Sequence, residues 1–206
     1  MSLYTLKPRF QALLRPAAGA LQRRGVTANQ VTVAAAAGSV VLGALLAAAA
    51  WTGQAHFFLL LPVWFFLRMA LNAIDGMLAR EFGQSSTLGA YLNELSDLLS
   101  DAALYLPFAW LDESGAALTL LVIFLANLSE MAGVLGIPAT GERRNDGPMG
   151  KSDRALVFGL LGLLVGTGSA PGWWLTGLLS IVALLLLVTI ANRIRYGIAA
   201  SKRRRP

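Results

Sequence analysis

The chain has 206 residues, of which 56% are hydrophobic and 14% are charged, and its mean hydropathy is +0.61. This balance excludes an ordinary soluble domain and predicts an all-α integral membrane protein. The sequence has no cysteine, and His56 is its one histidine, so disulfides, thiolate chemistry and multi-histidine metal sites are excluded; any bound metal takes oxygen ligands.

The first 25 residues, MSLYTLKPRFQALLRPAAGALQRRG, are amphipathic and carry basic residues throughout, without an A-x-A cleavage site. We therefore expect residues 1–25 to form an interfacial helix that stays on the mature protein, and not a signal peptide. The rest is expected to complete a single membrane domain over residues 1–206, with a six-helix core at 27–196 and a basic tail at 197–206.

Apolar runs long enough to cross a bilayer, which takes about 20 helical residues, occur six times: at 27–51, 57–80, 87–111, 116–138, 152–167 and 173–194. Lysine and arginine precede the first run, follow the second, lie between the fourth and fifth, and follow the sixth. The other three connections contain neither residue. Because basic loops stay in the cytoplasm, both termini are predicted to be cytoplasmic.

The net charge of +6 fits a cytoplasmic belt that faces anionic lipid headgroups. The terminal KRRRP is also compatible with nucleic-acid binding. A short basic run directly after a membrane helix is a more usual topology signal, so we expect membrane lipid, and no nucleic acid, as its partner.

Charged residues within membrane helices are costly, by about 2.5 to 3.5 kcal/mol each, and are candidates for function. Helical spacing places the polar residues of the second span on one face and those of the third span on one face. If the turn EFGQSS lies at the cytoplasmic surface, the polar residues of the two faces lie at the same depth in the membrane. They then form one pocket that opens inward, with Arg68, Asn72, Asp75 and Arg80 on one side and Asn93, Glu94, Asp97 and Asp101 on the other.

An oxygen-only site beside an arginine suits Mg²⁺ or Mn²⁺ with a phosphate-containing substrate. The alternative is that these polar groups only hold the helices together. The number of polar residues that converge at matched depth favours the metal site.

The spacing resembles the signature of the CDP-alcohol phosphotransferase family, D-x-x-D-G-x-x-A-R, eight residues, then G-x-x-x-D-x-x-x-D. Six of the eight positions agree, and asparagine replaces aspartate at the other two. The resemblance also extends to the expected architecture, so it covers nearly the whole chain. The matching residues are Asn72, Asp75, Gly76, Ala79, Arg80, Gly89, Asn93 and Asp97.

Members of this family transfer a phosphatidyl or related group from a CDP-linked lipid to an alcohol and release CMP. The resemblance implies that Asp97 is the general base on the acceptor hydroxyl. It implies a metal site of one or two Mg²⁺ or Mn²⁺ ions at Asp75, Asp97, Asn72 and Asn93. It also implies a cytidine diphosphate site at Gly76, Ala79, Arg80, Asp75 and Gly89.

The two asparagines leave the motif at a formal charge of −2, from Asp75 and Asp97, where two divalent ions bring +4. Three outcomes are open: a site with one metal, a site where Glu94 or Asp101 restores the lost charge, or a protein that binds a CDP-lipid without turning it over. The retained Asp97 and Arg80 favour an active enzyme.

The loop before the fifth span and the start of that span are basic, and the free N–H groups of a helix start attract anions. The resemblance implies that these residues hold the phosphate of a phosphorylated acceptor; positive-inside topology alone is the alternative. In the fourth span, Glu130 requires a basic partner if buried, such as Arg68 or Arg154. The candidate acceptor residues are Lys151, Ser152, Arg154, Arg143 and Arg144.

The resulting hypothesis is a bacterial inner-membrane enzyme, active as a homodimer on the cytoplasmic side. It transfers a phosphatidyl group from CDP-diacylglycerol to a small alcohol in phospholipid biosynthesis. A lipid-binding or membrane assembly protein that keeps the fold without the chemistry is the alternative. A small transporter is a third possibility, but it predicts internal repeats, and no clear repeat is found.

Overall fold

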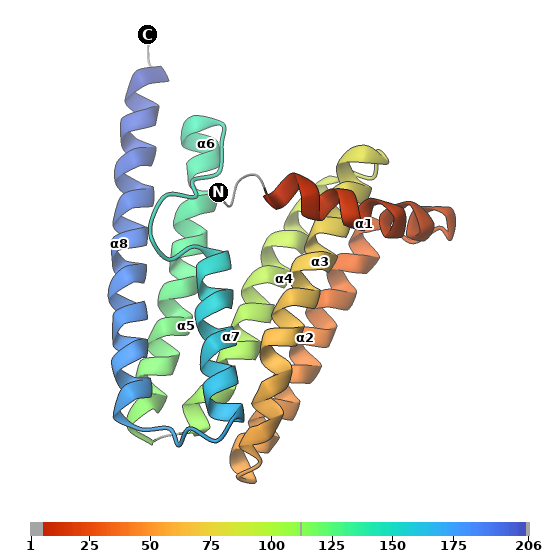
Figure 1. Ribbon diagram of the computed structural model, residues 1–206. Helices are drawn as coiled ribbons and strands as arrows, with labels where there is room; N and C mark the ends of the chain where they lie inside the picture. The colour runs from red at the N-terminus through yellow and green to blue at the C-terminus, as the bar shows by residue number, and fades with distance from the viewer. Residues whose placement is uncertain (1–5, 112, 205–206) are drawn as a thin grey trace. The chain divides into compact units, whose positions relative to one another are not determined.

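A computed structural model describes residues 6–111 and 113–204, and all regular secondary structure in these residues is helical (Figure 1). The predicted all-helical class is therefore confirmed. The elements are α1 (Leu6–Arg23), α2 (Ala28–Trp51), η2 (Ala55–Leu59), α3 (Leu60–Glu81), α4 (Thr87–Tyr105), η3 (Leu106–Trp110), α5 (Glu113–Val134), α6 (Gly136–Thr140), α7 (Lys151–Gly166) and α8 (Trp173–Arg204).

Four helical segments among the described residues are long and apolar enough to cross a membrane: Ala28–Trp51, Ala55–Glu81, Gly115–Thr140 and Trp173–Lys202. Helix α7 has 16 residues, which rise about 24 Å at 1.5 Å per residue and fall short of a hydrocarbon core of about 30 Å. Helix α4 carries three acidic residues. The six spans and the cytoplasmic termini stay predictions.

The last helix continues beyond its apolar run. We expected the core to end at residue 196 and a basic tail to follow, whereas α8 extends to Arg204. Hydropathy falls where the charged residues begin, but the helix continues through them, because alanine, lysine and arginine are all strong helix formers.

The chain divides into two compact units. The first holds the residues up to Leu42 together with Val63–Ala103. The second holds Gly43–Pro62 and the residues from Leu104 onward.

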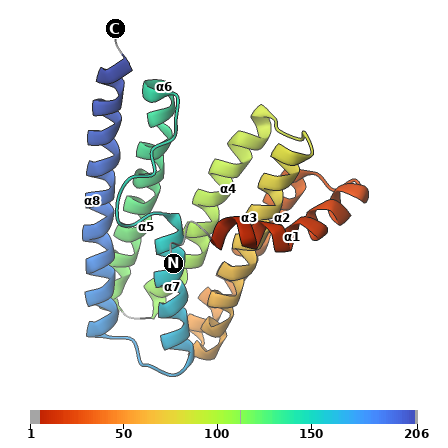
Figure 2. The same cartoon turned by 45° about the horizontal axis from the view of Figure 1, so that its top comes forward.

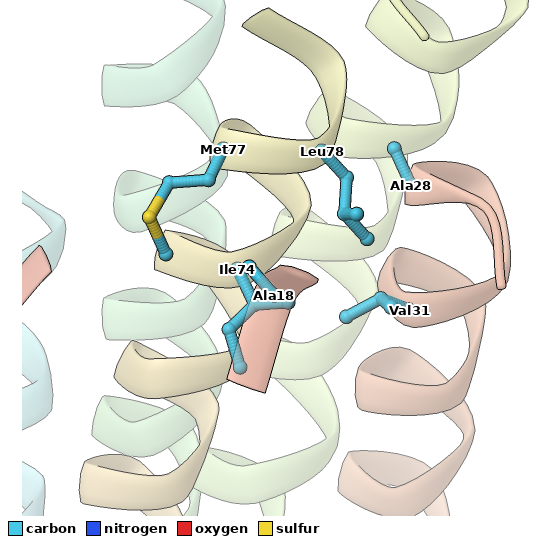
Figure 3. Packing of buried hydrophobic residues seen from close by; sticks show 6 residues of the cluster. All are labelled: Ala18, Ala28, Val31, Ile74, Met77 and Leu78. Atoms are coloured by element: carbon cyan, nitrogen blue, oxygen red, sulfur yellow. The ribbon is translucent and has the colours of Figure 1, made fainter. Parts of the chain in front are cut away.

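In the first unit, α1 runs crosswise at one end of α2 and α3 (Figure 1; Figure 2). Ala18 of α1 is fully buried in an apolar cluster with α2 and α3, while Leu13 is 78% exposed. A helix with one packed and one exposed apolar face is consistent with the predicted interfacial helix, whose place at a membrane surface stays a prediction. Figure 3 shows the cluster, formed by Ala18, Ala28, Val31, Ile74, Met77 and Leu78.

The turn between α3 and α4 is tied to the start of α2. The side chain of Gln84 accepts a hydrogen bond from the Ala28 amide at 2.7 Å, which satisfies one of the free donors of that helix end. Thr27 and Gln30 form a reciprocal capping pair at the same end, with bonds of 2.9 and 3.2 Å. Ser86 accepts from the Gly89 amide at 2.9 Å and caps α4. These bonds fix the starts of α2 and α4 and the turn that follows α3.

In the second unit, α5 packs along α8 and α7 packs against η2 (Figure 1). The rings of Tyr105 and Phe158 stack with centroids 3.7 Å apart. Close approach of α7 to η2 depends on Gly162, where a Cβ would lie 3.0 Å from the Leu61 Cβ and from the Phe58 carbonyl oxygen. Small residues permit such contact between helices in membranes.

Gly162→Val is expected to destabilise the protein by about 1–3 kcal/mol, because the added side chain overpacks the contact with Phe58 and Leu61. Gly177→Val is the matched control, since nothing lies within 4 Å of a Cβ at that position of α8. The same substitution changes helix propensity equally at both sites. Thermal unfolding in detergent measures the difference, and equal losses would contradict close packing at Gly162.

Candidate functional site

A cavity of about 330 Å³ lies within the first unit, at the end of the unit where Gln84 joins the turn to α2. Its lining comes from α2, α3, the turn and α4. The lining residues are Ala28, Asn29, Thr32, Asn72, Asp75, Gly76, Ala79, Arg80, Gln84, Ser85, Ser86, Gly89, Ala90 and Asn93. Seven of the eight signature positions are therefore brought together, and Asp97 is the one that is not among the lining residues.

The two glycines of the signature leave room for polar side chains. A Cβ at Gly76 would lie 2.6 Å from an Nη atom of Arg80, so the guanidinium of Arg80 folds back over Gly76. A Cβ at Gly89 would lie 2.8 Å from the Asn29 side-chain oxygen. The absence of a side chain at each position thus allows an arginine and an amide to reach the cavity.

Asp75 supplies the one carboxylate among the described residues that line the cavity. It is 6% exposed, and the Thr32 hydroxyl donates to its Oδ2 at 2.8 Å. Thr32 and Asn29 lie on α2 and were not predicted as site residues. Both are polar and belong to the same N-terminal segment, TANQVT, which was a signal that could have indicated them.

Two acidic residues further along α4, Asp97 and Asp101, both bind Arg68 of α3. Arg68 of α3 donates from Nη1 to the Asp101 carboxylate at 2.5 Å. It donates from Nη2 to both the carboxylate and the backbone carbonyl of Asp97, each at 3.2 Å. The side chains of Arg68, Asp97 and Asp101 are 4%, 16% and 6% exposed. Glu94 is half-buried on α4 and is not among the lining residues of the cavity.

The cavity lining suits a hard divalent cation. Asp75 supplies a carboxylate, Thr32 a hydroxyl, and Asn29, Asn72 and Asn93 supply amide oxygens, all of which are ligand types that Mg²⁺ and Mn²⁺ accept. Among residues 6–111 and 113–204, no three Asp, Glu or His side chains gather as metal ligands. The set therefore fits a site that is rich in amides and poor in charge.

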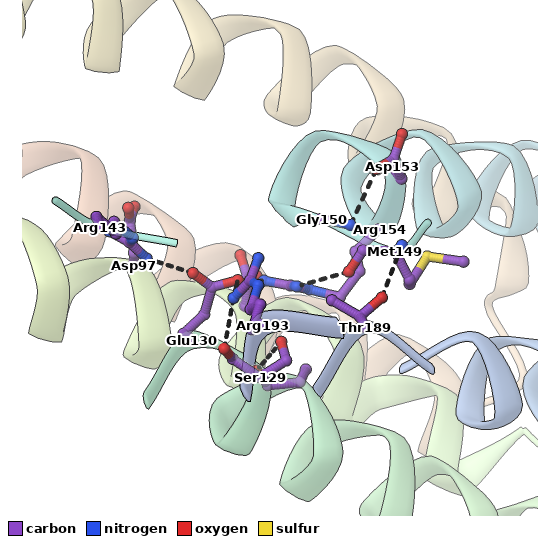
Figure 4. A network of polar contacts seen from close by, with 12 residues as sticks. Asp97, Ser129, Glu130, Arg143, Met149, Gly150, Asp153, Arg154, Thr189 and Arg193 are labelled. Carbon is purple, nitrogen blue, oxygen red and sulfur yellow. Dashed lines mark hydrogen bonds and ion pairs between the residues drawn. The ribbon is translucent and has the colours of Figure 1, made fainter. Parts of the chain in front are cut away.

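A second polar cluster lies in the second unit, around Glu130 of α5 (Figure 4). Arg143 and Arg154 both form ion pairs with its carboxylate, the latter at 3.0 Å. Arg193 of α8 lies 3.5 Å from the same carboxylate and donates to the Ser129 carbonyl. The expected pairing of Glu130 with Arg154 is thus confirmed. Arg193 was assigned to the topology signal, so its place in the cluster was missed.

The other candidate acceptor residues are placed separately. Arg144 forms a bidentate pair with Asp146 at 2.8 and 3.0 Å. At the start of α7, the Asp153 carboxylate accepts from the Gly150 amide at 2.9 Å, so an acidic group already caps this helix end. Ser152 is exposed and Lys151 is half-buried.

Comparison with known proteins identifies one family. The family model described as CDP-alcohol phosphatidyltransferase matches residues 25–188. The inner membrane protein YnbA of Escherichia coli K12 is 52% identical over 197 residues, which cover 95% of this chain and 96% of YnbA. A phosphatidylinositol phosphate synthase of Mycobacteroides abscessus is 28% identical over 192 residues, which cover 89% and 83% of the two chains.

The fold is similar to that of the phosphatidylinositol phosphate synthase PgsA1 of Mycobacterium tuberculosis. Its crystal structure with CDP-DAG bound gives a TM-score of 0.74 at 19% identity and covers 90% of this chain and 94% of that one. The structure in complex with manganese and citrate gives 0.72 at 19% identity and covers 90% and 88%. At this identity the likeness shows a shared fold.

Glu130→Gln is expected to destabilise the protein by about 3–5 kcal/mol, because it removes the one acid that Arg143, Arg154 and Arg193 share in a buried cluster. Glu81→Gln is the matched control; its pair with Arg15 is exposed, and its loss should change stability little. Thermal unfolding in detergent compares the two variants. If both melt alike, the cluster does not stabilise the fold.

Proposed function

The chain belongs to the CDP-alcohol phosphatidyltransferase family, and from this premise we propose that it transfers the phosphatidyl group of CDP-diacylglycerol to a small alcohol, with release of CMP, in phospholipid biosynthesis. The cavity of the first unit carries this proposal, because seven signature positions line it. Its volume of about 330 Å³ lies within the usual range of ligand pockets, about 300 to 1,000 Å³.

The donor diphosphate is proposed to lie between α3 and α4. The guanidinium of Arg80 offers paired N–H donors to phosphate oxygens. Gly76 and Gly89 leave room for the Arg80 guanidinium and the Asn29 amide, which are proposed to contact the nucleotide, and the small Ala79 lines the cavity beside them. The PgsA1 crystal structure with CDP-DAG bound supports this class of donor.

A divalent cation is proposed to bind at Asp75, with the amide oxygens of Asn72 and Asn93 as further ligands. The carboxylate and amide oxygens of the lining fit Mg²⁺ or Mn²⁺, and the manganese complex of PgsA1 supports a divalent ion. When bound, the ion neutralises charge on the diphosphate. Thr32 holds the Asp75 carboxylate in place by its hydrogen bond.

Asp97 is proposed as the general base. It follows Asn93 by one turn of α4, on the same face of that helix. In the reaction the acceptor hydroxyl oxygen bonds to the phosphorus of the phosphatidyl group, the bond from that phosphorus to the CMP oxygen breaks, and the hydroxyl proton passes to the Asp97 carboxylate. CMP leaves with the electron pair of the broken bond.

The acceptor is proposed to be a phosphorylated alcohol. Arginine side chains bind phosphate through paired N–H groups, and Arg143, Arg154 and Arg193 gather around one carboxylate. Within the part of the chain that the structure describes, the buried Nε of Arg193 has no hydrogen-bond partner, which is a donor that an acceptor phosphate would satisfy. Lys151, Ser152 and Arg144 stay candidates for the same role.

The setting is proposed to be a bacterial inner membrane. The similarity to YnbA, an inner membrane protein of E. coli, supports this location, and the four apolar helical segments support a multi-pass protein. The six spans, the cytoplasmic termini, the cytoplasmic orientation of the site and the homodimer are part of the proposal.

CMP release tests the proposal. Purified protein in detergent with Mg²⁺ or Mn²⁺, labelled CDP-diacylglycerol and a panel of alcohols should release CMP with at least one acceptor, and phosphorylated acceptors should be preferred over their dephosphorylated forms. The alternative is a CDP-lipid-binding protein without turnover, which asparagine at the signature positions 72 and 93 favours. Binding of the donor with no CMP release for any acceptor would support that alternative.

Asp97→Asn is expected to lower turnover by about 100-fold or more, because general bases contribute about 10²- to 10⁴-fold, while CDP-diacylglycerol still binds. The amide keeps the size of the side chain, so the fold is little changed. Initial rates of CMP release and donor binding by fluorescence titration separate the two effects. Full activity of this variant would show that Asp97 is not the base.

A further inference from the structure

Arg68 has no assigned role in the transfer described above, yet it contacts the proposed base. Its two terminal nitrogens reach two acidic residues one turn apart on α4: Nη1 bonds Asp101 at 2.5 Å and Nη2 bonds the Asp97 carboxylate at 3.2 Å. A second bond from Nη2 to the Asp97 carbonyl, also at 3.2 Å, fixes the guanidinium against the helix backbone. The rigid fork of an arginine is suited to hold two carboxylates at once.

The burial of this group makes the charges of its members interdependent. Arg68 and Asp101 are 4% and 6% exposed, so each requires the opposite charge beside it. A carboxylate in such a pair is a poor metal ligand, because a cation at the same oxygen would also meet the guanidinium. Asp101 is therefore assigned to Arg68 and not to a metal.

Asp75 has a different environment. Its carboxylate accepts a hydrogen bond from the Thr32 hydroxyl at 2.8 Å, and it lines the cavity beside Asn72 and Asn93. It is the one carboxylate among the described lining residues. The cavity therefore offers a divalent ion one negative side chain and several neutral oxygens.

We propose that Arg68 is a positioning residue that holds the carboxylate of Asp97 and withdraws Asp97 and Asp101 from metal binding, so that the cavity takes one divalent ion, with Asp75 as its carboxylate ligand. The positive charge that a second ion would supply to the α4 acids is supplied by the protein itself. This inference rests on the proposed function for its catalytic part, whereas the number of bound ions does not depend on turnover.

Counting the ions tests the metal half of the inference. Protein in detergent with CDP-diacylglycerol is loaded with Mn²⁺, free metal is removed, and bound Mn²⁺ is measured by metal analysis and electron paramagnetic resonance. One isolated ion per chain is expected. Two ions per chain with a spin-coupled spectrum would overturn the inference, whether or not CMP is released.

The Asn72→Asp/Asn93→Asp double variant is the matched control for the count. It adds two carboxylates to the cavity lining without change in side-chain size. A second Mn²⁺ with spin coupling is expected in this variant, which also shows that the spectrum detects a pair. If the variant still binds one ion, the charge of the lining does not set the number, and that part of the inference is wrong.

Arg68→Met tests the positioning half. The variant is expected to lower kcat by about 100-fold, the loss that a catalytic group displaced by about 1 Å brings, while KM for CDP-diacylglycerol changes less than about threefold, because the donor cavity is retained. Arg68→Met/Asp101→Asn keeps the net charge of the group at −1 (one arginine and one aspartate removed) and protects the fold.

The charge-balanced double variant shows whether Arg68 positions Asp97 or only neutralises the charge of Asp101. Folding with a wild-type unfolding midpoint, but with kcat still reduced, supports the role of Arg68 in holding Asp97. Recovery of wild-type kcat would overturn it, because Arg68 would then only balance Asp101. If wild-type protein releases no CMP, the proposed function fails on its own, and the ion count still tests the metal half.

Discussion

The free-energy cost of a charge within an apolar helix governs how this chain is built. Each buried charged group described in the two units has a partner that offsets this cost: Arg68 has two α4 acids, Glu130 has three arginines, and Asp75 has the Thr32 hydroxyl. The buried polar residues therefore act as paired groups and not as isolated ligands. Asp75 also lines the cavity, unlike the other acids named here.

Helical periodicity predicted seven of the eight signature residues that line the cavity, but it also placed Asp97 there, which is not among the lining residues. Asn72, Asp75 and Gly76 recur at helical spacing on α3, so a sequence with no structure already places them on one face. Asn29 and Thr32 were out of reach of this reasoning, because they come from α2, and the helix that packs beside a given face is decided by tertiary contacts. The polar segment TANQVT was the one sequence signal for them, and it does not say which helix face α2 packs against.

Other differences have the same physical origin. Sequence alone left Glu130 with more than one possible basic partner. The fold selected Arg143 of the loop, Arg154 of α7 and Arg193 of α8. The sequence analysis assigned Arg193 to the positive-inside signal, because a basic residue directly after an apolar run is expected from topology alone. A charge with two sufficient explanations cannot be assigned from sequence. The end of α8 at Arg204 likewise depends on the helix propensity of its residues, which a hydropathy profile does not measure.

The bond between Gln84 and the Ala28 amide has a consequence for binding thermodynamics. With Ser86 and Thr27, it holds the α3–α4 turn and two helix starts in place. A loop that is already ordered loses little conformational entropy when a ligand arrives. If the cavity binds the donor proposed above, its selectivity for the nucleotide is set by the fit to a preformed surface and not by loop closure.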